Sequence, residues 1–329
     1  MTSPSAYPAI DRFRLVAALL IVAIHTSPLA SYSATADFLL TRDLARVAVP
    51  FFFMVTGYFV LPKNAHALLH FEKRTVLLYA LVILLYLPVN MYMRSFQSMG
   101  AFLQQLLVDG TLYHLWYLPA VLSGVLISKG LYHVFNLRAA LTIALVLYLI
   151  GLGGDSYYGL LVQWPAAEQF YALLFHFCSY TRNGLFFAPI FMLLGTALAM
   201  HPPHCTARQL WLGLTLSAAL MTGEVLLLRA LAWPRHDSMT LFLLPTMFFL
   251  FALLLRPRGA RLSLAADTAM LVYILHPLMI LVVRFTARLT HTQMLFIDNT
   301  LLHFSAVSLL SFSCAFMLSA FKHSLEGKS

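Results

Sequence analysis

The sequence predicts an all-α protein: a polytopic membrane helix bundle of about ten transmembrane helices, with both termini cytoplasmic. Of the 329 residues, 61% are hydrophobic and only 10% are charged, whereas soluble domains carry about 25% charged residues. The apolar runs are continuous and about 20 residues long, which is the length that an α-helix needs to cross a bilayer. They lack the ten-residue alternating pattern of a transmembrane β-barrel, so helices are favoured.

The apolar runs define the individual elements in order. The ten expected membrane helices are 11–30, 43–62, 72–93, 113–134, 138–152, 183–200, 208–231, 239–255, 264–287 and 298–321. The fifth is short enough to be a partial span. Residues 99–109 are expected to form an amphipathic turn or helix at the membrane surface, and the aromatic connection 153–182 to lie on the surface or close over a site.

Basic residues predict the orientation of this single membrane domain, residues 1–329. Lys and Arg concentrate on cytoplasmic loops, and most of them fall on the side of the N-terminus, including Lys73, Arg74 and the RPRGAR run at 256–261. The net charge of +9 is therefore attributed to membrane orientation, and no nucleic-acid partner is expected. The lipid bilayer of a bacterial cytoplasmic (inner) membrane is the expected environment of this multi-pass chain.

Cysteine usage and short motifs exclude several other classes. Cys178, Cys205 and Cys314 are far apart in the sequence and predict no disulfide framework. The stretch HPPHC at 201–205 contains metal-binding residue types, but its prolines favour a loop, and no metal site is expected. No phosphate-binding loop motif is present, which argues against an ATP-driven motor.

The first expected helix carries Arg14 and His25, the leading candidates for catalysis. They are eleven positions apart, within about 20° of a whole number of turns, so they share one helix face about 16 Å apart along the axis. Ionisable groups at membrane depth are costly and are functional candidates by default. The alternative for His25 is a structural hydrogen bond between helices. Asp11 can pair with Arg14 at i,i+3 and is assigned a supporting role.

Further polar residues interrupt the other apolar segments. The candidates for substrate binding are His114, Trp116, Arg182, Glu224, Lys73 and Arg74. Each has a structural alternative: an interfacial aromatic belt for Trp116, an interfacial or positive-inside anchor for the basic residues, and a partner from another helix or a cavity for Glu224.

Thr56 and His276 are expected to have supporting roles. Thr56-Gly57 forms a small spot at which another helix can approach closely. His276 precedes Pro277, so a polar group coincides with a helix kink.

Four of these motifs together resemble a known family. Asp11-x-x-Arg14 followed after ten residues by His25, PFFFMVTGYF at 50–59, HLWYL at 114–118 and His276-Pro277 resemble, in order, segments of the acyltransferase-3 family of bacterial integral membrane acyltransferases. Residues 11–29 and 181–195 are most similar to the membrane domain of vancomycin-resistance serine racemases. That resemblance implies a membrane module without the racemase domain.

The resemblance implies an O-acyltransferase, which moves groups other than amino-acyl groups. It implies transfer of an acyl group, commonly acetyl, from acyl-CoA to a hydroxyl of a glycan or other small acceptor in the cell envelope. His25 would be the general base, and Arg14 the donor or oxyanion contact. Acetyl-CoA would be a co-substrate, and no permanently bound cofactor is expected. The family's arginine-rich third helix is represented here only by Lys73-Arg74, which keeps open the alternative of a transport module for a small polar solute such as serine.

Overall fold

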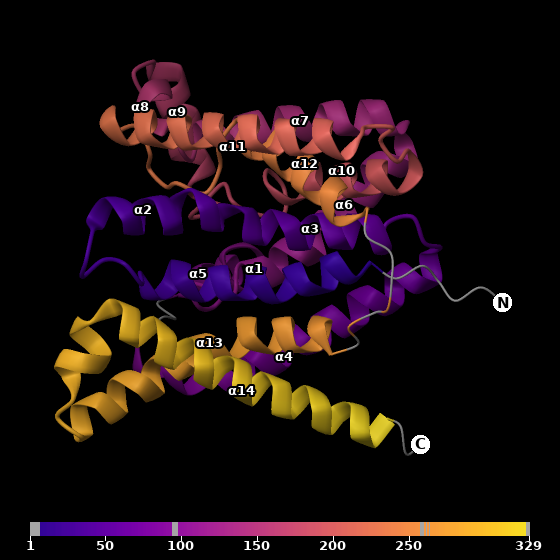
Figure 1. The fold of residues 1–329 in the computed structure, drawn as a ribbon. Helices are drawn as coiled ribbons and strands as arrows, with labels where there is room; N and C mark the ends of the chain where they lie inside the picture. The colour runs from indigo at the N-terminus through magenta and orange to yellow at the C-terminus, as the bar shows by residue number, and fades with distance from the viewer. Residues whose placement is uncertain (1–6, 94–97, 257–259, 261, 263, 327–329) are drawn as a thin grey trace. The chain divides into compact units, whose positions relative to one another are not determined.

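The computed structural model describes residues 7–93, 98–256, 260, 262 and 264–326, and every regular element among them is a helix (Figure 1). This confirms the all-α class. The chain forms two compact units: Met1–Val49 together with Phe249–Ser329, and Pro50–Phe248.

Several of the expected spans are present as long apolar helices. Within the described residues, four helices are long and apolar enough to cross a membrane, Ala65–Tyr92, Ala207–Ala230, Ala265–Leu289 and Thr300–Leu325, and three shorter apolar helices accompany them, Leu137–Gly153, Ala188–Met200 and Leu243–Leu254. The total of ten spans and the cytoplasmic termini stay predictions. Arg258 and Arg261 of the RPRGAR run lie outside the described residues.

Helix α1 (Pro8–Thr26) organises the first unit. Pro8 occupies its first turn, where a missing N–H costs nothing. The helix ends earlier than expected because Ser27 adopts a left-handed conformation with φ 47°. One face of α1 packs against α13 (Ala265–Leu289), and α1 also contacts α14 (Thr300–Glu326).

The remaining elements of the first unit are short. Helices α13 and α14 lie along each other (Figure 1) and are joined by the π-helix η3 (Met294–Asp298). Helix α2 (Ala34–Arg42) and the 3-10 helix η1 (Leu44–Val47) also pack against α1. These contacts cover part of α1 and bury Asp11, whereas Val16 and Leu19 stay exposed.

The second unit is built around α10 (Ala188–Met200), which packs on α6 (Tyr117–Val134) and α7 (Leu137–Gly153). Helix α3 (Ala48–Phe59) also meets α10 closely, because a Cβ on Gly57 would overlap the Met192 carbonyl. The Thr196 hydroxyl donates to the Gly57 carbonyl at 2.9 Å. This confirms the predicted close approach at Thr56-Gly57.

The fourth expected span, 113–134, is helical only from Tyr117 onward. Before it come α5 (Met99–Gln104), the π-helix η2 (Gln105–Asp109) and an irregular segment, 110–116, that begins at Gly110 with φ 79°. The expected helix within 99–109 is therefore present. The Tyr79 hydroxyl of α4 (Ala65–Tyr92) donates to the Leu106 carbonyl at 3.0 Å, so η2 lies against the middle of α4.

The long connection after α7 folds into two short helices, α8 (Tyr158–Leu161) and α9 (Pro165–Leu174). It is followed in the chain by α10, α11 (Ala207–Ala230) and α12 (Leu243–Leu254). The HPPHC stretch is a loop between α10 and α11, as expected.

Candidate functional site

Asp11 and Arg14 form the predicted ion pair in the first turns of α1. Arg14 Nη1 lies 2.9 Å from Asp11 Oδ1. The second carboxylate oxygen, Oδ2, accepts the backbone N–H of Leu262 at 3.1 Å, just before α13 begins. Asp11 is buried, and two donors hold its carboxylate. Asp11 therefore orients the Arg14 guanidinium and links α1 to the start of α13.

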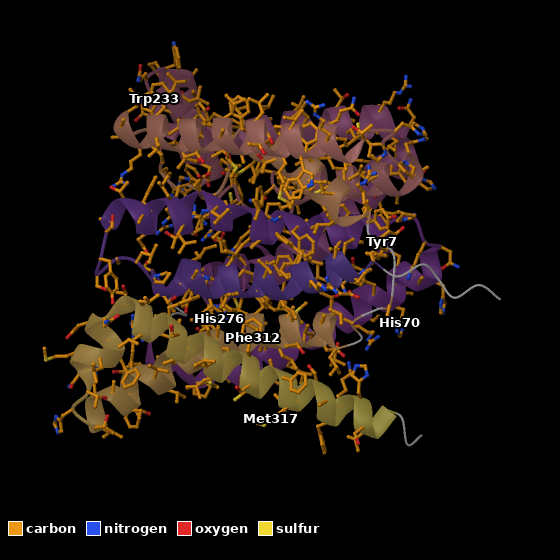
Figure 2. All side chains as sticks on the ribbon, in the orientation of Figure 1. Tyr7, His70, Trp233, His276, Phe312 and Met317 are labelled. Carbon is orange, nitrogen blue, oxygen red and sulfur yellow. The ribbon has the colours of Figure 1, made fainter. Side chains whose placement is uncertain are left out.

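His25 meets a second histidine, His276 of α13. The two rings stack with centroids 5.1 Å apart and an interplanar angle of 23°. His276 is completely buried, and Figure 2 shows it on α13. The sequence marked both residues but did not predict that they meet. The stack combines the leading catalytic candidate and a supporting candidate into one site.

The backbone next to Pro277 explains the orientation of His276. Proline has no N–H, so the carbonyl four residues earlier, that of Tyr273, loses its helical donor. His276 Nδ1 lies 2.9 Å from this carbonyl and 3.2 Å from that of Val272. Because carbonyls only accept, Nδ1 carries the proton, and Nε2 is left as an acceptor. The His-Pro motif thus sets both the orientation and the tautomer of the ring.

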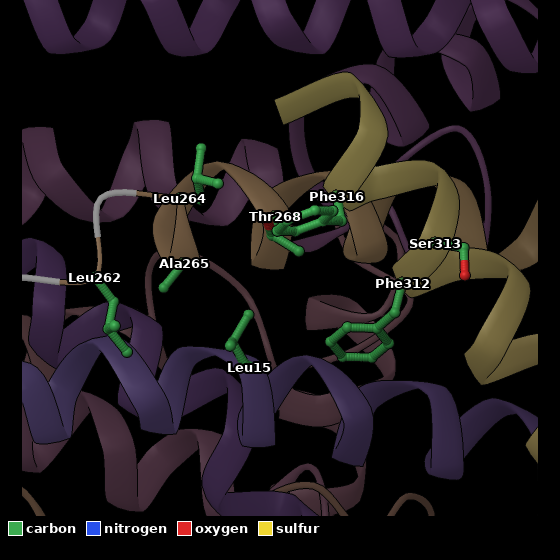
Figure 3. A pocket seen from close by; sticks show the side chains of 8 residues that line it. All are labelled: Leu15, Leu262, Leu264, Ala265, Thr268, Phe312, Ser313 and Phe316. Atoms are coloured by element: carbon green, nitrogen blue, oxygen red, sulfur yellow. The ribbon is translucent and has the colours of Figure 1, made fainter. Parts of the chain in front are cut away.

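An apolar pocket lies between α1, α13 and α14 (Figure 3). One of its lining residues, Leu15, directly follows Arg14 in the chain. Its volume is about 620 Å³. The lining residues are Leu15, Leu262, Leu264, Ala265, Thr268, Phe312, Ser313 and Phe316. Such a lining suits a hydrocarbon chain better than a polar ligand.

In the second unit, Trp116 and Arg182 are in contact. The Arg182 guanidinium lies 5.0 Å from the centroid of the Trp116 ring and 4.6 Å from that of Tyr180. The Arg235 guanidinium also approaches Tyr180, with 5.9 Å to the ring centroid, and it lies 3.7 Å from the centroid of the Phe175 ring. Aromatic faces attract guanidinium groups in this geometry. The structure thus joins two predicted residues to Tyr180 and Arg235, which the sequence analysis missed.

His114 is buried in the irregular segment before α6. Its ring lies 5.2 Å from that of Tyr86 on α4, in an edge-on arrangement at 75°. His114 is therefore packed inside the protein rather than exposed on its surface. A substrate contact by His114 stays a prediction.

Glu224 holds two connections of the second unit together. Its Oε1 accepts the Tyr157 hydroxyl at 2.8 Å and the Leu241 N–H at 2.7 Å, and its Oε2 accepts the Phe242 N–H at 3.0 Å. Burial raises the pKa of Tyr157, and the hydrogen bond to Glu224 raises it further, so the phenol stays a donor at neutral pH. The expected partner of Glu224 is therefore found outside its own helix, and these contacts support a structural role.

Asp155 is a buried carboxylate that the sequence analysis did not select. Its Oδ1 accepts the backbone N–H groups of Ser238 and Met239 at 2.8 and 3.0 Å and the Ser156 hydroxyl at 3.0 Å. His236 Nδ1 lies 3.5 Å from Oδ2. Its position directly after Gly153-Gly154 at a helix end was the available signal. Asp155 fastens the segment before α12 to the end of α7.

The remaining candidates are less constrained. The Thr56 hydroxyl donates to the Phe52 carbonyl of its own helix at 3.1 Å, a structural contact. Lys73 and Arg74 are exposed on α4. This exposure is equally compatible with a positive-inside anchor and with a contact to the acyl-CoA donor. Among the described residues, no group of three metal-ligating side chains converges.

Comparisons with known proteins place these residues in a family context. The chain is 42% identical over its whole length to an "Amino-acid racemase" of Enterococcus faecalis, and 36% identical over 94% of its length to a "Serine/alanine racemase" of Enterococcus gallinarum. The chain spans about half the length of these relatives, 47% and 45% respectively. No solved structure matches it.

The family assignment is direct. The sequence matches the family described as "Acyltransferase domain" (acyltransferase-3) over residues 7–320, nearly the entire chain. This range includes the Arg14–His25 face of α1 and the His276-Pro277 motif. The expected resemblance is confirmed, and the chain belongs to the acyltransferase-3 family of membrane acyltransferase domains.

Proposed function

We propose that this protein is an O-acyltransferase that moves an acyl group, commonly acetyl, from acyl-CoA to a hydroxyl of a glycan or other cell-envelope acceptor. The observation that carries the proposal is the acyltransferase family match over residues 7–320. The stacked pair of His25 and His276 supports it, because a catalytic base must be held in a defined orientation.

In the proposed reaction, His25 is the general base. Its neutral imidazole accepts the proton of the acceptor hydroxyl while the oxygen attacks the thioester carbonyl carbon. The carbon–sulfur bond then breaks, and CoA leaves as a thiolate that takes the proton from the imidazolium. The new ester and CoA thiol account for all atoms, with no oxidant or reductant.

Arg14 is proposed to contact the donor. Its guanidinium is oriented by Asp11 and is suited to bind a CoA phosphate or the oxyanion formed at the thioester. The pairing reduces the cost of placing a cation within a membrane helix. Lys73 and Arg74 are a second proposed contact for CoA phosphates, since both are exposed.

Turnover of acetyl-CoA by the purified full-length protein tests the proposal. His25→Gln should lower turnover by about 100-fold or more, as expected for loss of a general base. His201→Gln is the matched control, because His201 lies exposed in the loop before α11. The acyltransferase proposal is wrong if the wild-type protein does not bind acetyl-CoA, does not hydrolyse it and does not transfer its acetyl group.

A second candidate is transport of a small polar solute such as serine. It is favoured by the name of the relative "Serine/alanine racemase", of which this chain matches about half. Radiolabelled serine uptake into proteoliposomes measures it directly. Uptake equal to that of empty liposomes would remove this candidate.

A further inference from the structure

Helix α9, in the aromatic connection between α7 and α10, carries large apolar side chains that face outward. Phe170 and Leu173 of α9 and Phe177 in the turn after it are 48%, 62% and 69% exposed. At 100° per residue, these three positions fall within an arc of about 60° on one side of the helix. A helix on a water-facing surface turns its apolar stripe toward the core, whereas α9 turns this stripe away from the core of its own unit.

The other exposed side of α9 is polar. Glu168, Gln169 and His176 are exposed, and by the same periodicity they fall on the other side of the buried Tyr171. The helix thus has one buried edge, one exposed apolar side and one exposed polar side. This three-way division is typical of a helix that lies in the plane of a membrane–water interface, with one side in lipid and the other in water.

Contacts at both ends hold α9 in this orientation. The Tyr171 hydroxyl donates to the Ile150 carbonyl of α7 at 2.8 Å, and a Cβ on Gly153 would overlap that hydroxyl. After α9, the Thr181 hydroxyl donates to the Gly151 carbonyl at 2.7 Å. Rotation of the apolar stripe toward the core would break these bonds, so the stripe is a fixed outer surface and not a lid waiting to close.

A second segment of the same unit repeats the pattern. Leu103 of α5 and Leu107 of η2 are 46% and 63% exposed. The polar groups of this segment turn toward the chain that follows α9: Gln104 Nε2 donates to Asp109 Oδ2 at 2.9 Å, and the Ser179 hydroxyl donates to the same oxygen at 2.7 Å. Two segments that meet here keep polar groups inside and apolar groups outside, as expected for a surface that contacts lipid.

The charge beside α9 matches the phosphates of a phospholipid surface. Arg235 is exposed, its guanidinium lies 3.7 Å from the centroid of the Phe175 ring, and Nη1 donates to the Ser179 carbonyl at 2.7 Å. Trp164, at the start of α9, is 54% exposed. Tryptophan collects at the headgroup level of membranes, and guanidinium groups bind phosphate through charge-assisted hydrogen bonds.

We propose that α9 and the α5–η2 segment form an anchor in the phospholipid interface. Phe170, Leu173 and Phe177 enter the boundary between headgroups and acyl chains, and Arg235 lies at the level of the phosphates. The connection begins where α7 ends, and α7 itself exposes Leu145 and other apolar residues along its length. The lipid-facing surface of the helices therefore continues onto α9. This inference concerns membrane contact, and it requires neither an acyl donor nor an acceptor.

The first experiment measures the depth of α9 in vesicles of phosphatidylethanolamine and phosphatidylglycerol. A nitroxide is attached to Leu173→Cys or Phe177→Cys in the full-length protein without native cysteines, and collisions with oxygen and with a water-soluble nickel complex are compared. The ratio of oxygen to nickel accessibility should exceed that of Glu168→Cys, on the polar side of the same helix, by about tenfold, because hydrocarbon excludes the nickel complex.

Two results of this comparison would overturn the proposal. Equal ratios at Leu173→Cys and Glu168→Cys would show that water covers both sides of α9. Low accessibility of Leu173→Cys to both reagents would show that protein covers the apolar stripe.

The second experiment keeps the native cysteines and remains decisive if the variant without them does not fold. The photoreactive residue p-benzoylphenylalanine replaces Phe177, or Glu168 as the matched control, in the full-length protein in the same vesicles. Irradiation should attach a phospholipid at position 177, with at least a tenfold lower yield at position 168, as measured by mass spectrometry, because only the apolar side enters the acyl-chain boundary by about 5–10 Å. A cross-link to this chain or to a second copy, or no adduct at all, would overturn the proposal.

Discussion

His276 shows how one residue can depend on its neighbour in the chain. Pro277 removes the donor that would pair with the Tyr273 carbonyl, and His276 Nδ1 takes that place at 2.9 Å. The ring is thereby held parallel to His25, with centroids 5.1 Å apart. We interpret His276 as a positioning residue that keeps the His25 ring in one orientation.

The first prediction concerns this stack. His276→Ala should lower kcat for acetyl-CoA turnover by about five- to tenfold, because an aromatic pair contributes about 1 kcal/mol, while KM for acetyl-CoA changes little. The control is His303→Ala, because His303 is also buried in the first unit and bonds only to the Phe296 carbonyl among the contacts described. An equal effect of both variants would show general destabilisation instead of positioning.

A second prediction at residue scale concerns pH. Burial and, to a smaller extent, the nearby Asp109 carboxylate together raise the pKa of the Cys178 thiol to about 11, although Arg235 acts in the opposite direction. Because the thiolate is the reactive form, alkylation of Cys178 by iodoacetamide should be very slow at pH 7.5 and should accelerate toward pH 11. Site-resolved mass spectrometry measures this, with the more exposed Cys205 as the internal reference. Equal rates at pH 7.5 would contradict it.

At the scale of elements, the contact between α3 and α10 depends on two glycines. A Cβ on Gly57 would overlap the Met192 carbonyl, and one on Gly195 would overlap the Met54 carbonyl. Close backbone approach through small residues is the usual way in which membrane helices associate, because lipid offers no hydrophobic driving force between them.

The third prediction tests this contact with matched substitutions. Gly57→Ala should destabilise the protein by about 1–3 kcal/mol, because the helices must separate to accept the methyl group. Gly130→Ala in α6 meets nothing within 4 Å and should be neutral or stabilise by about 0.5–1 kcal/mol. Melting temperatures in one detergent compare the two variants, and equal shifts would show that the contact contributes little.

At the scale of the whole molecule, the fourth prediction concerns orientation. The distribution of basic residues predicts that both termini are cytoplasmic. A C-terminal green fluorescent protein fusion should therefore fluoresce, whereas a C-terminal alkaline phosphatase fusion should be inactive. The opposite result would contradict the cytoplasmic location of the C-terminus.

Much of the fold follows from local pattern. The apolar runs predict helices because hydrogen bonds within each helix satisfy the backbone in lipid. Helix ends were less predictable: α1 ends at Thr26, and α6 begins only at Tyr117. Those limits depend on local backbone conformation and on the packing of the irregular segment 110–116, which hydropathy does not report.

The sequence by itself determined that this is an all-α membrane protein of the acyltransferase-3 family, with Arg14 and His25 on one face of α1, because helical periodicity is a property of neighbouring residues. Only the tertiary structure decided which groups meet. It paired His25 with His276, engaged Glu224 with Tyr157 and two backbone N–H groups, and left Asn90 buried without a partner among the described residues. Such contacts join residues tens to hundreds of positions apart, and they depend on how helices pack rather than on the pattern within any one of them.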